Sequence, residues 1–387
     1  MKYDFETICD RRGKGSRKWM PVEDFEELIV PFSVADMEFN TAPEIKKELI
    51  NYIENNILGY TTYMDDYLEE VVKWQKDIHD LDIKEEYIVS TPGVVSALYY
   101  LILTLTKEDD GIIIFKPVYH PFTASVEAAN RNVINCPLIN KDGYYKIDFE
   151  KFEDLAADPK NKAIIFCNPH NPVGRVWTED ELTKIVEISK KYNILIISDE
   201  IWSDITMSGF KTTSILKVAG DYLDSVVVST AASKTFNLAG LTCSNIIIPN
   251  KLIKRAFLKE LEKPHLAVPA LGFVGTKAAY KYGKDWMKEM INVVEENYKY
   301  TKNFFEENIN GSVVSPLEGT YATWVDLRSL GLDKNQLEKF LVEKAKFYVN
   351  QGYFFGEEGE GFIRINLACP KSVLKDSLNR LKIAIES

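Results

Sequence analysis

The segment that decides the fold is KAIIFCNPHNPVGRVWTEDELTKIVEISKKYNILIISDEIW, residues 162–202. It contains two short and almost continuously apolar runs, Lys162–Cys167 and Ile194–Ser198, which are typical of strands buried on both faces. Between them, Thr178 and Glu181 form a capping-box pattern, and the residues that follow place apolar side chains at helical spacing. A strand, a helix and a strand in series predict two parallel strands joined by a crossover helix.

Further runs of the same type lie on either side of this segment, at Gly111–Phe115, Ser225–Ser229 and Ser244–Pro249. Together the runs predict an α/β fold in which helices cover both faces of a mostly parallel central sheet. The longest nearly apolar stretch, Val94–Thr106, is too short to cross a bilayer. It is therefore predicted to be a helix buried in the core.

The pattern changes after Pro249. A long charged helical stretch is followed by two apolar runs and two further helices, at residues 277–307, 321–327, 334–345, 362–368 and 372–385. Helices and strands in this arrangement are typical of an α+β unit. We therefore expect a large domain, residues 46–275, and a smaller α+β domain formed by both chain ends, residues 1–45 and 276–387.

Composition disfavours several classes of protein. The chain has 387 residues and a formal net charge of −11, which argues against a nucleic-acid partner. The only basic cluster, residues 11–18, is short and is followed by acidic residues, so we expect it to be solvated or to contact another subunit. The cysteines are scattered singly without metal-ligand spacing, so we expect no metal site and a reducing compartment. The first residues lack the apolar core of a signal peptide, and a cytoplasmic location without membrane association is expected.

Two ionisable side chains follow buried runs. Lys234 ends the small-residue segment STAASK, residues 229–234. A lysine there is either a surface charge or, in a desolvated pocket that lowers its pKa, a nucleophile able to form a Schiff base. Asp199 follows the run that ends at Ser198, and a buried carboxylate needs a cationic partner. It is either part of a helix cap or ion pair, or the group that keeps a pyridine nitrogen protonated.

Two turns complete the set. CNPHNPVGRVW, Cys167–Trp177, either only joins a strand to a helix or also presents an amide side chain to a ligand oxygen. STPGVVSALYY, Ser90–Tyr100, places a glycine turn before an apolar helix whose free N–H groups can bind phosphate. In open α/β sheets, ligands bind where the carboxyl ends of strands meet loops, and each of these segments follows a predicted strand end.

In this order the motifs resemble those of the class I/II aminotransferase family, whose members depend on pyridoxal 5'-phosphate (PLP), over nearly the whole chain. Further motifs resemble in particular the cystathionine β-lyase, or C–S lyase, branch of that family: DRRGKGSRKW (Asp10–Trp19), VADMEF (Val34–Phe39), GYTTY (Gly59–Tyr63), KPVYHPF (Lys116–Phe122) and ASKTFNLAGL (residues 232–241). The resemblance implies the aspartate-aminotransferase-like fold of PLP-dependent transferases, PLP as cofactor, an amino acid as substrate and a homodimer with shared active sites.

The resemblance also assigns roles around the cofactor ring. Lys234 is the implied Schiff-base lysine and proton-transfer group, and Asp199 pairs with the pyridinium nitrogen. Tyr119 stacks on the ring and Asn171 bonds the phenolic oxygen. Trp202 occupies a position where many relatives have Tyr, and it is expected to stack or to donate its N–H.

For the cofactor phosphate, the resemblance implies the loop at Gly93, Val94 and Val95, hydroxyl groups of Ser233 and Thr230, and Tyr60 from the neighbouring subunit. Many aminotransferases have Arg eight residues after the Schiff-base lysine, where this chain has Thr242, so the phosphate site is expected to be less cationic.

For the substrate, Arg364 is implied to clamp the α-carboxylate, with Ala35 and Asn171 beside it. The alternative for Arg364 is a salt bridge within the small domain. The implied reaction is α,β-elimination of L-cystathionine or a related cysteine thioether to a thiol, pyruvate and ammonia. The alternatives are a PLP-dependent aminotransferase of an unidentified amino acid, and a PLP-retaining regulator that binds a protein partner.

Overall fold

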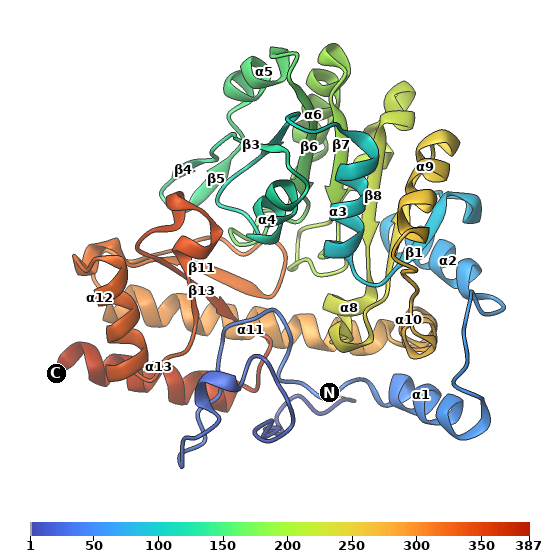
Figure 1. Cartoon of the computed structure of the whole chain (residues 1–387). Helices are drawn as coiled ribbons and strands as arrows, with labels where there is room; N and C mark the ends of the chain where they lie inside the picture. Colours follow the sequence, from blue (N-terminus) through green and yellow to red (C-terminus); the bar gives the residue numbers. More distant parts are fainter. Residues whose placement is uncertain (1) are drawn as a thin grey trace.

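A computed structural model describes residues 2–387. Its central feature is a seven-stranded sheet in the order β1-β9-β8-β7-β6-β2-β3 (Figure 1). The strands are β1 (Ile88–Thr91), β2 (Gly111–Ile114), β3 (Asn132–Asn135), β6 (Asn161–Cys167), β7 (Leu195–Asp199), β8 (Val226–Thr230) and β9 (Ser244–Ile247). Neighbouring strands pair in parallel except for β9, which is antiparallel to both β1 and β8. The expected α/β class with a mostly parallel sheet is confirmed.

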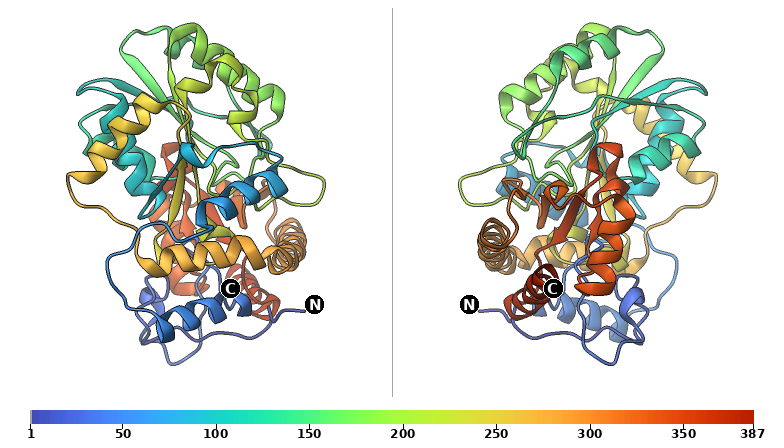
Figure 2. Two further views of the ribbon diagram at one scale, coloured as in Figure 1. Left: turned by 90° about the vertical axis from the view of Figure 1, so that its right-hand side faces the viewer. Right: turned by 90° about the vertical axis from the view of Figure 1, so that its left-hand side faces the viewer.

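Helices cover both faces of this sheet (Figure 2). One face carries α3 (Val94–Leu105), α4 (Pro121–Ala128) and α9 (Lys251–Glu262), and the other carries α5 (Phe149–Ala157), α6 (Glu179–Tyr192) and α7 (Ile215–Val218). Successive side chains of a strand point to opposite faces, and β2 shows this directly. Ile112 and Ile114 pack in the first layer, whereas Ile113 packs in the second.

The predicted crossover helix is α6. Thr178 accepts a hydrogen bond from the Glu181 N–H, and the Glu181 carboxylate accepts one from the Thr178 N–H, so the capping box is present. The helix buries Leu182 and Ile185 against the sheet. The parallel pair β6 and β7 that it connects is confirmed.

A second, antiparallel sheet lies below the first in Figure 1, in the order β10-β11-β13-β12. Its strands are β10 (Val313–Val314), β11 (Ala322–Asp326), β12 (Asn350–Gln351) and β13 (Phe362–Asn366), and a small hairpin joins β4 (Ile139–Lys141) to β5 (Tyr144–Lys146). Beside the second sheet lie α11 (Lys284–Asn308), α12 (Lys334–Lys339) and α13 (Lys371–Glu386).

Two predicted helices differ in the structure. The stretch 277–307 is divided between α10 (Ala270–Tyr282) and α11, because the chain turns at Gly283. A side chain at Gly283 would collide with the ring of Phe236, so close packing at this turn requires a glycine. The helix expected near 334–345 ends at Lys339 and continues as a π-helical turn.

The N-terminal segment packs against the C-terminal part of the chain, and both ends lie in the lower half of Figure 1. Backbone hydrogen bonds join Phe32 N–H to the Tyr348 carbonyl (2.7 Å) and Asn366 N–H to the Phe32 carbonyl (3.0 Å). After this segment come α1 (Pro43–Asn55), α2 (Tyr67–His79) and, much later, the short helix α8 (Ala232–Thr235). The domain boundaries given above remain a prediction.

The basic cluster is not uniformly solvated, which corrects the first of the two alternatives expected for that segment; contact with another subunit stays a prediction. Lys18 has a side chain only 1% exposed, and its Nζ lies 2.8 Å from the Glu38 carboxylate. Arg11 bonds both Asp36 and Glu38. The sequence shows a run of basic residues, but it does not show that Asp36 and Glu38 pair with Arg11 and Lys18 in the fold. Among the helices of residues 2–387, none has both the length and the apolar content to cross a membrane.

Candidate active site

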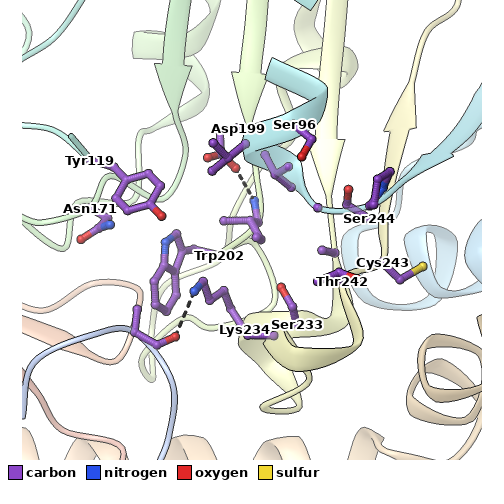
Figure 3. Close-up of a pocket in the computed structure, with 18 of the residues that line it drawn as sticks. Ser96, Tyr119, Asn171, Asp199, Trp202, Ser233, Lys234, Thr242, Cys243 and Ser244 are labelled. Atoms are coloured by element: carbon purple, nitrogen blue, oxygen red, sulfur yellow. Dashed lines mark hydrogen bonds between the residues drawn. The ribbon is translucent and has the colours of Figure 1, made fainter. Parts of the chain in front are cut away.

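A cavity opens at the edge of the central sheet where β6, β7 and β8 end (Figure 3). The structure brings the four segments singled out in the sequence together around it. The residues that line it are Ala35, Pro92, Gly93, Val94, Val95, Ser96, Tyr119, Cys167, Asn171, Asp199, Ile201, Trp202, Ala231, Ser233, Lys234, Ala239, Thr242, Cys243 and Ser244. Parallel strands converge on one edge, so loops far apart in sequence become neighbours there.

Lys234 enters the cavity from α8, the short helix that follows β8. Its Nζ donates a hydrogen bond to the Ala35 carbonyl at 2.9 Å. Burial and the positive charge of Arg364 lower the pKa of Lys234 to about 8, although Asp36 and Asp199 act in the opposite direction. The amine therefore loses its proton far more readily than an ordinary lysine, as a nucleophile or a base requires.

Asp199 is the last residue of β7 and is only 6% exposed. Its Oδ1 accepts one hydrogen bond, from the Ile201 N–H at 3.1 Å. Within residues 2–387, no basic side chain reaches salt-bridge distance of this carboxylate. Burial accordingly raises the pKa of Asp199 to about 7, with Lys234 and the Ile201 N–H only partly offsetting it. A carboxylate in this environment is stabilised by any cation that enters the cavity.

Arg364 reaches toward the site from β13 of the second sheet. Its Nη1 donates to Asn171 Oδ1 at 2.9 Å and its Nη2 to Asn350 Oδ1 at 2.7 Å, while Nε has no hydrogen-bond partner. No carboxylate in the described part of the chain, residues 2–387, forms a salt bridge with it, so the structural alternative of an ion pair in the small domain is not found. Burial lowers the pKa of Arg364 to about 10.

Two aromatic residues stand at the centre of the cavity. Tyr119 follows β2 and lies near Asn171, and the indole of Trp202 lies between Tyr119 and Lys234 (Figure 3). Trp202 packs edge-to-face on Tyr321, with ring centroids 4.6 Å apart. The Tyr321 hydroxyl donates to the same Ala35 carbonyl that Lys234 bonds, at 2.8 Å. The sequence analysis did not identify Tyr321, because a tyrosine immediately before a strand carries no local signal of function.

The opposite end of the cavity is rich in hydroxyl groups. Gly93 precedes α3 with φ of 94°, a conformation that favours glycine, and no side chain caps the first N–H groups of this helix. Val94, Val95 and Ser96 form its first turn, and Ser233, Thr242 and Ser244 line the facing wall. Ser244 was missed because it begins β9. Since β9 runs antiparallel, its first residue lies at the edge where its neighbours end.

Three predicted site residues do not line the cavity. Thr230 is buried and its hydroxyl donates to the Asn245 carbonyl at 3.3 Å, so its expected role as a phosphate donor stays a prediction. Arg364 lies behind Asn171, to which it is bonded. Tyr60 is fully exposed and stands away from this cavity.

Comparisons with known proteins place this geometry in a family. The sequence matches the family of class I and II aminotransferases over residues 28–381. It is 34% identical over 385 residues to cystathionine beta-lyase PatB of Bacillus subtilis, covering 99% of this chain and 100% of that protein. It is 32% identical over 395 residues to protein MalY of Escherichia coli, covering 100% and 99% respectively.

Comparison with solved structures gives the same result as the sequence comparisons. The crystal structure of cystalysin from Treponema denticola, which contains pyridoxal 5'-phosphate, matches with a TM-score of 0.97 at 41% identity and covers 100% of this chain and 99% of that chain. The PLP-bound C–S lyase from Staphylococcus hominis matches with a TM-score of 0.93 at 33% identity, covering 100% and 99%. These matches confirm the aspartate-aminotransferase-like fold and the resemblance to the C–S lyase branch. The chain belongs to the family of class I and II aminotransferases.

Proposed function

We propose that this protein is a PLP-dependent C–S lyase that eliminates a thiol from L-cystathionine or a related cysteine thioether. One observation carries the proposal. Lys234 and Asp199 line one cavity, Arg364 is buried beside it and bonded to the lining residue Asn171, and no residue of the described chain, 2–387, forms a salt bridge with any of the three. Burying unpaired charges is costly, so such a set persists where a bound molecule supplies the counter-charges.

The donor set fits PLP. Asp199 offers an unpaired carboxylate for a pyridinium nitrogen, and Lys234 offers an amine of low pKa for the aldehyde carbon. Asn171 uses its Oδ1 on Arg364, so its Nδ2 remains to donate to a phenolic oxygen. The uncapped start of α3 and the hydroxyl groups of Ser233 and Thr242 suit a phosphate.

When bound, PLP withdraws electrons from the substrate α-carbon and so stabilises negative charge there. Arg364 holds the substrate α-carboxylate and orients the Cα–H bond, because a guanidinium binds a carboxylate through two parallel N–H donors. Lys234 Nζ removes the α-proton. The Ala35 carbonyl, 2.9 Å from Nζ, keeps the ammonium in the cavity after it has accepted that proton.

The bond between Cβ and sulfur then breaks, and its electron pair leaves on sulfur. The thiolate takes up a proton and departs as the thiol. The remaining three-carbon fragment reacts with water to give pyruvate and ammonia. Asp199 would hold the pyridinium nitrogen of bound PLP, and that positive charge would in turn keep the buried carboxylate ionised, because no basic side chain of residues 2–387 lies at salt-bridge distance from it.

We further propose that the enzyme is a cytoplasmic homodimer with shared active sites. Ile53, Ile57 and Leu58 are 51%, 90% and 64% exposed and precede the fully exposed Tyr60. Several exposed apolar side chains close together in the chain are typical of a protein–protein interface. A second copy packed on this stretch would bring Tyr60 toward the hydroxyl-rich end of the partner's cavity.

The deciding experiment incubates the holoenzyme with L-cystathionine in the absence of any keto acid. The proposal predicts pyruvate, ammonia and homocysteine in equal amounts. The second candidate, an aminotransferase, is favoured by the family to which the chain belongs and uses the same residues. Turnover that requires a keto acid and yields a new amino acid would establish that activity in place of the lyase.

A further inference from the structure

We infer that Asn350 is a positioning residue for Arg364: it orients the guanidinium for the substrate α-carboxylate and leaves its positive charge free. Asn350 also connects Arg364 to the backbone segment whose carbonyl accepts a hydrogen bond from Lys234. The inference rests on the proposed role of Arg364. It concerns a residue that neither the motifs nor the cavity lining identifies.

The position of Asn350 follows from sheet register. Asn350 in β12 stands directly opposite Arg364 in β13, and cross-strand partners share one face of the sheet. The Asn350 amide oxygen accepts a hydrogen bond from Arg364 Nη2 at 2.7 Å. On the other side, Asn171 accepts from Nη1 at 2.9 Å, and the guanidinium carbon lies 4.8 Å from the centre of the Phe355 ring. Contacts on three sides therefore restrict the guanidinium to one orientation.

The chemistry of these contacts is as important as their geometry. Both hydrogen-bond acceptors are amide oxygens and the third contact is an aromatic ring, so none of them carries a negative charge. A carboxylate at either position would form an ion pair and neutralise the arginine. Amides satisfy its N–H groups and leave the positive charge available, which is what capture of an anionic substrate group requires.

The same oxygen makes a second contact. Asn350 Oδ1 also accepts from the Val34 N–H at 3.1 Å. Val34 has φ of 51°, an unfavourable conformation for a β-branched residue, and this bond helps to hold it. The next residue, Ala35, offers the carbonyl that accepts from Lys234 Nζ. One side-chain oxygen thus links the carboxylate-binding arginine to the segment that positions the lysine.

The test measures binding of an unreactive acid to the holoenzyme. The probe is 3-(methylthio)propionate, which has the carboxylate and thioether of a substrate but no amine to attack the cofactor. Its neutral amide, 3-(methylthio)propionamide, is the ligand control. The variants are Asn350→Asp, which keeps an oxygen acceptor of the same size but adds a charge, and Asn350→Ala, which removes the acceptor. Asn303→Asp, on the exposed surface of α11, is the matched control for the added charge.

Asn350→Asp should weaken binding of the acid by about tenfold or more, because the new carboxylate forms an ion pair with Arg364. Binding of the neutral amide should be unchanged. With a reactive substrate, the same variant should raise KM much more than it lowers kcat. Asn350→Ala should weaken acid binding less, and it should shift the pH at which the visible absorbance of the lysine-linked cofactor titrates, because Ala35 is no longer held. Asn303→Asp should change none of these quantities.

If Asn350 had only a structural role, Asn350→Ala would weaken acid binding more than Asn350→Asp, since an aspartate can accept from the Val34 N–H as well as an asparagine does. Acid binding by Asn350→Asp at the wild-type level would therefore overturn the inference. So would a wild-type enzyme that binds the acid no better than the amide. These binding results do not depend on which products form from L-cystathionine, so failure of the lyase assay and failure of this inference are separable.

Discussion

Replacing Asp199 by Asn is expected to change activity and stability in opposite directions. The substitution keeps the shape of the side chain and an oxygen that can accept from the Ile201 N–H, now 3.1 Å from Oδ1. It removes the negative charge that we propose faces the cofactor ring. Losing a charge-assisted hydrogen bond of this kind costs ~2–4 kcal/mol of transition-state stabilisation, so kcat should fall by roughly 30- to 900-fold.

The same substitution should increase the stability of the cofactor-free protein. Burial raises the pKa of Asp199 from 3.8 to about 7, so the folded protein binds a proton on this group that the unfolded chain has already lost. The associated stability is present at low pH and is lost as the pH rises from 3.8 through about 7. At pH 8 the loss is up to about 4 kcal/mol. Asn does not titrate, so the variant without cofactor should be more stable than wild type, by a margin that grows between pH 5 and pH 8.

The assay compares melting temperatures of the two cofactor-free proteins across this pH range, together with kcat of the holoenzymes. Glu200→Gln is the matched control. Glu200 is the next residue and is equally buried, but it bonds Ser198 and the Ile215 N–H and does not line the cavity. It should keep near-normal kcat. Near-normal kcat in Asp199→Asn, or a melting-temperature difference that is the same at pH 5 and pH 8, would refute the reasoning.

Other predictions address the remaining parts of the site. Lys234→Ala should bind PLP without a covalent link and lose proton transfer, and a borohydride-stable adduct on another lysine in peptide mapping would contradict this assignment. Because the pKa of Lys234 is lowered to about 8, the rate of PLP attachment to cofactor-free protein should rise with pH and level off above about 8, whereas a midpoint near 10.5 would indicate an ordinary lysine. In Gly93→Ala the added Cβ would have no atom within 4 Å, but the backbone φ of 94° would be strained. PLP affinity should therefore fall by roughly tenfold while the fold persists. Unchanged affinity in a titration would exclude the proposed phosphate loop. An equal mixture of the inactive variants Tyr60→Ala and Lys234→Ala should regain up to about a quarter of wild-type activity if subunits exchange and sites are shared. Half of the dimers are then hybrids, and each hybrid has one intact site. No recovery in a mixture shown to contain hybrids would exclude shared sites.

The amino-acid sequence by itself determined the central sheet and the main chemical groups. The runs at 162–167 and 194–198 were predicted as strands because continuous apolar character is a local property, and the capping box at Thr178 is likewise contained within four residues. Lys234, Asp199 and Asn171 were identifiable because each follows such a run. The edge where parallel strands end can be deduced from strand order alone.

Other features depended on contacts between distant segments. Ser244 joined the cavity only because β9 runs antiparallel, and no residue within that strand encodes its direction. Lys18 is buried because Glu38 and Asp36 lie against it, although its own neighbours in sequence suggest a solvated charge.

The environment of Arg364 is the clearest case. The sequence indicated an arginine in an apolar strand, but not whether its partners would be carboxylates or amides. That difference decides whether the arginine closes a salt bridge or remains open to a ligand. It was decided by the register of β12 on β13 and by the loop that carries Asn171, which approach from 14 and 193 residues away in the chain. A local pattern cannot specify such partners, because hydrogen bonding between side chains depends on distances in space that only the packed chain sets.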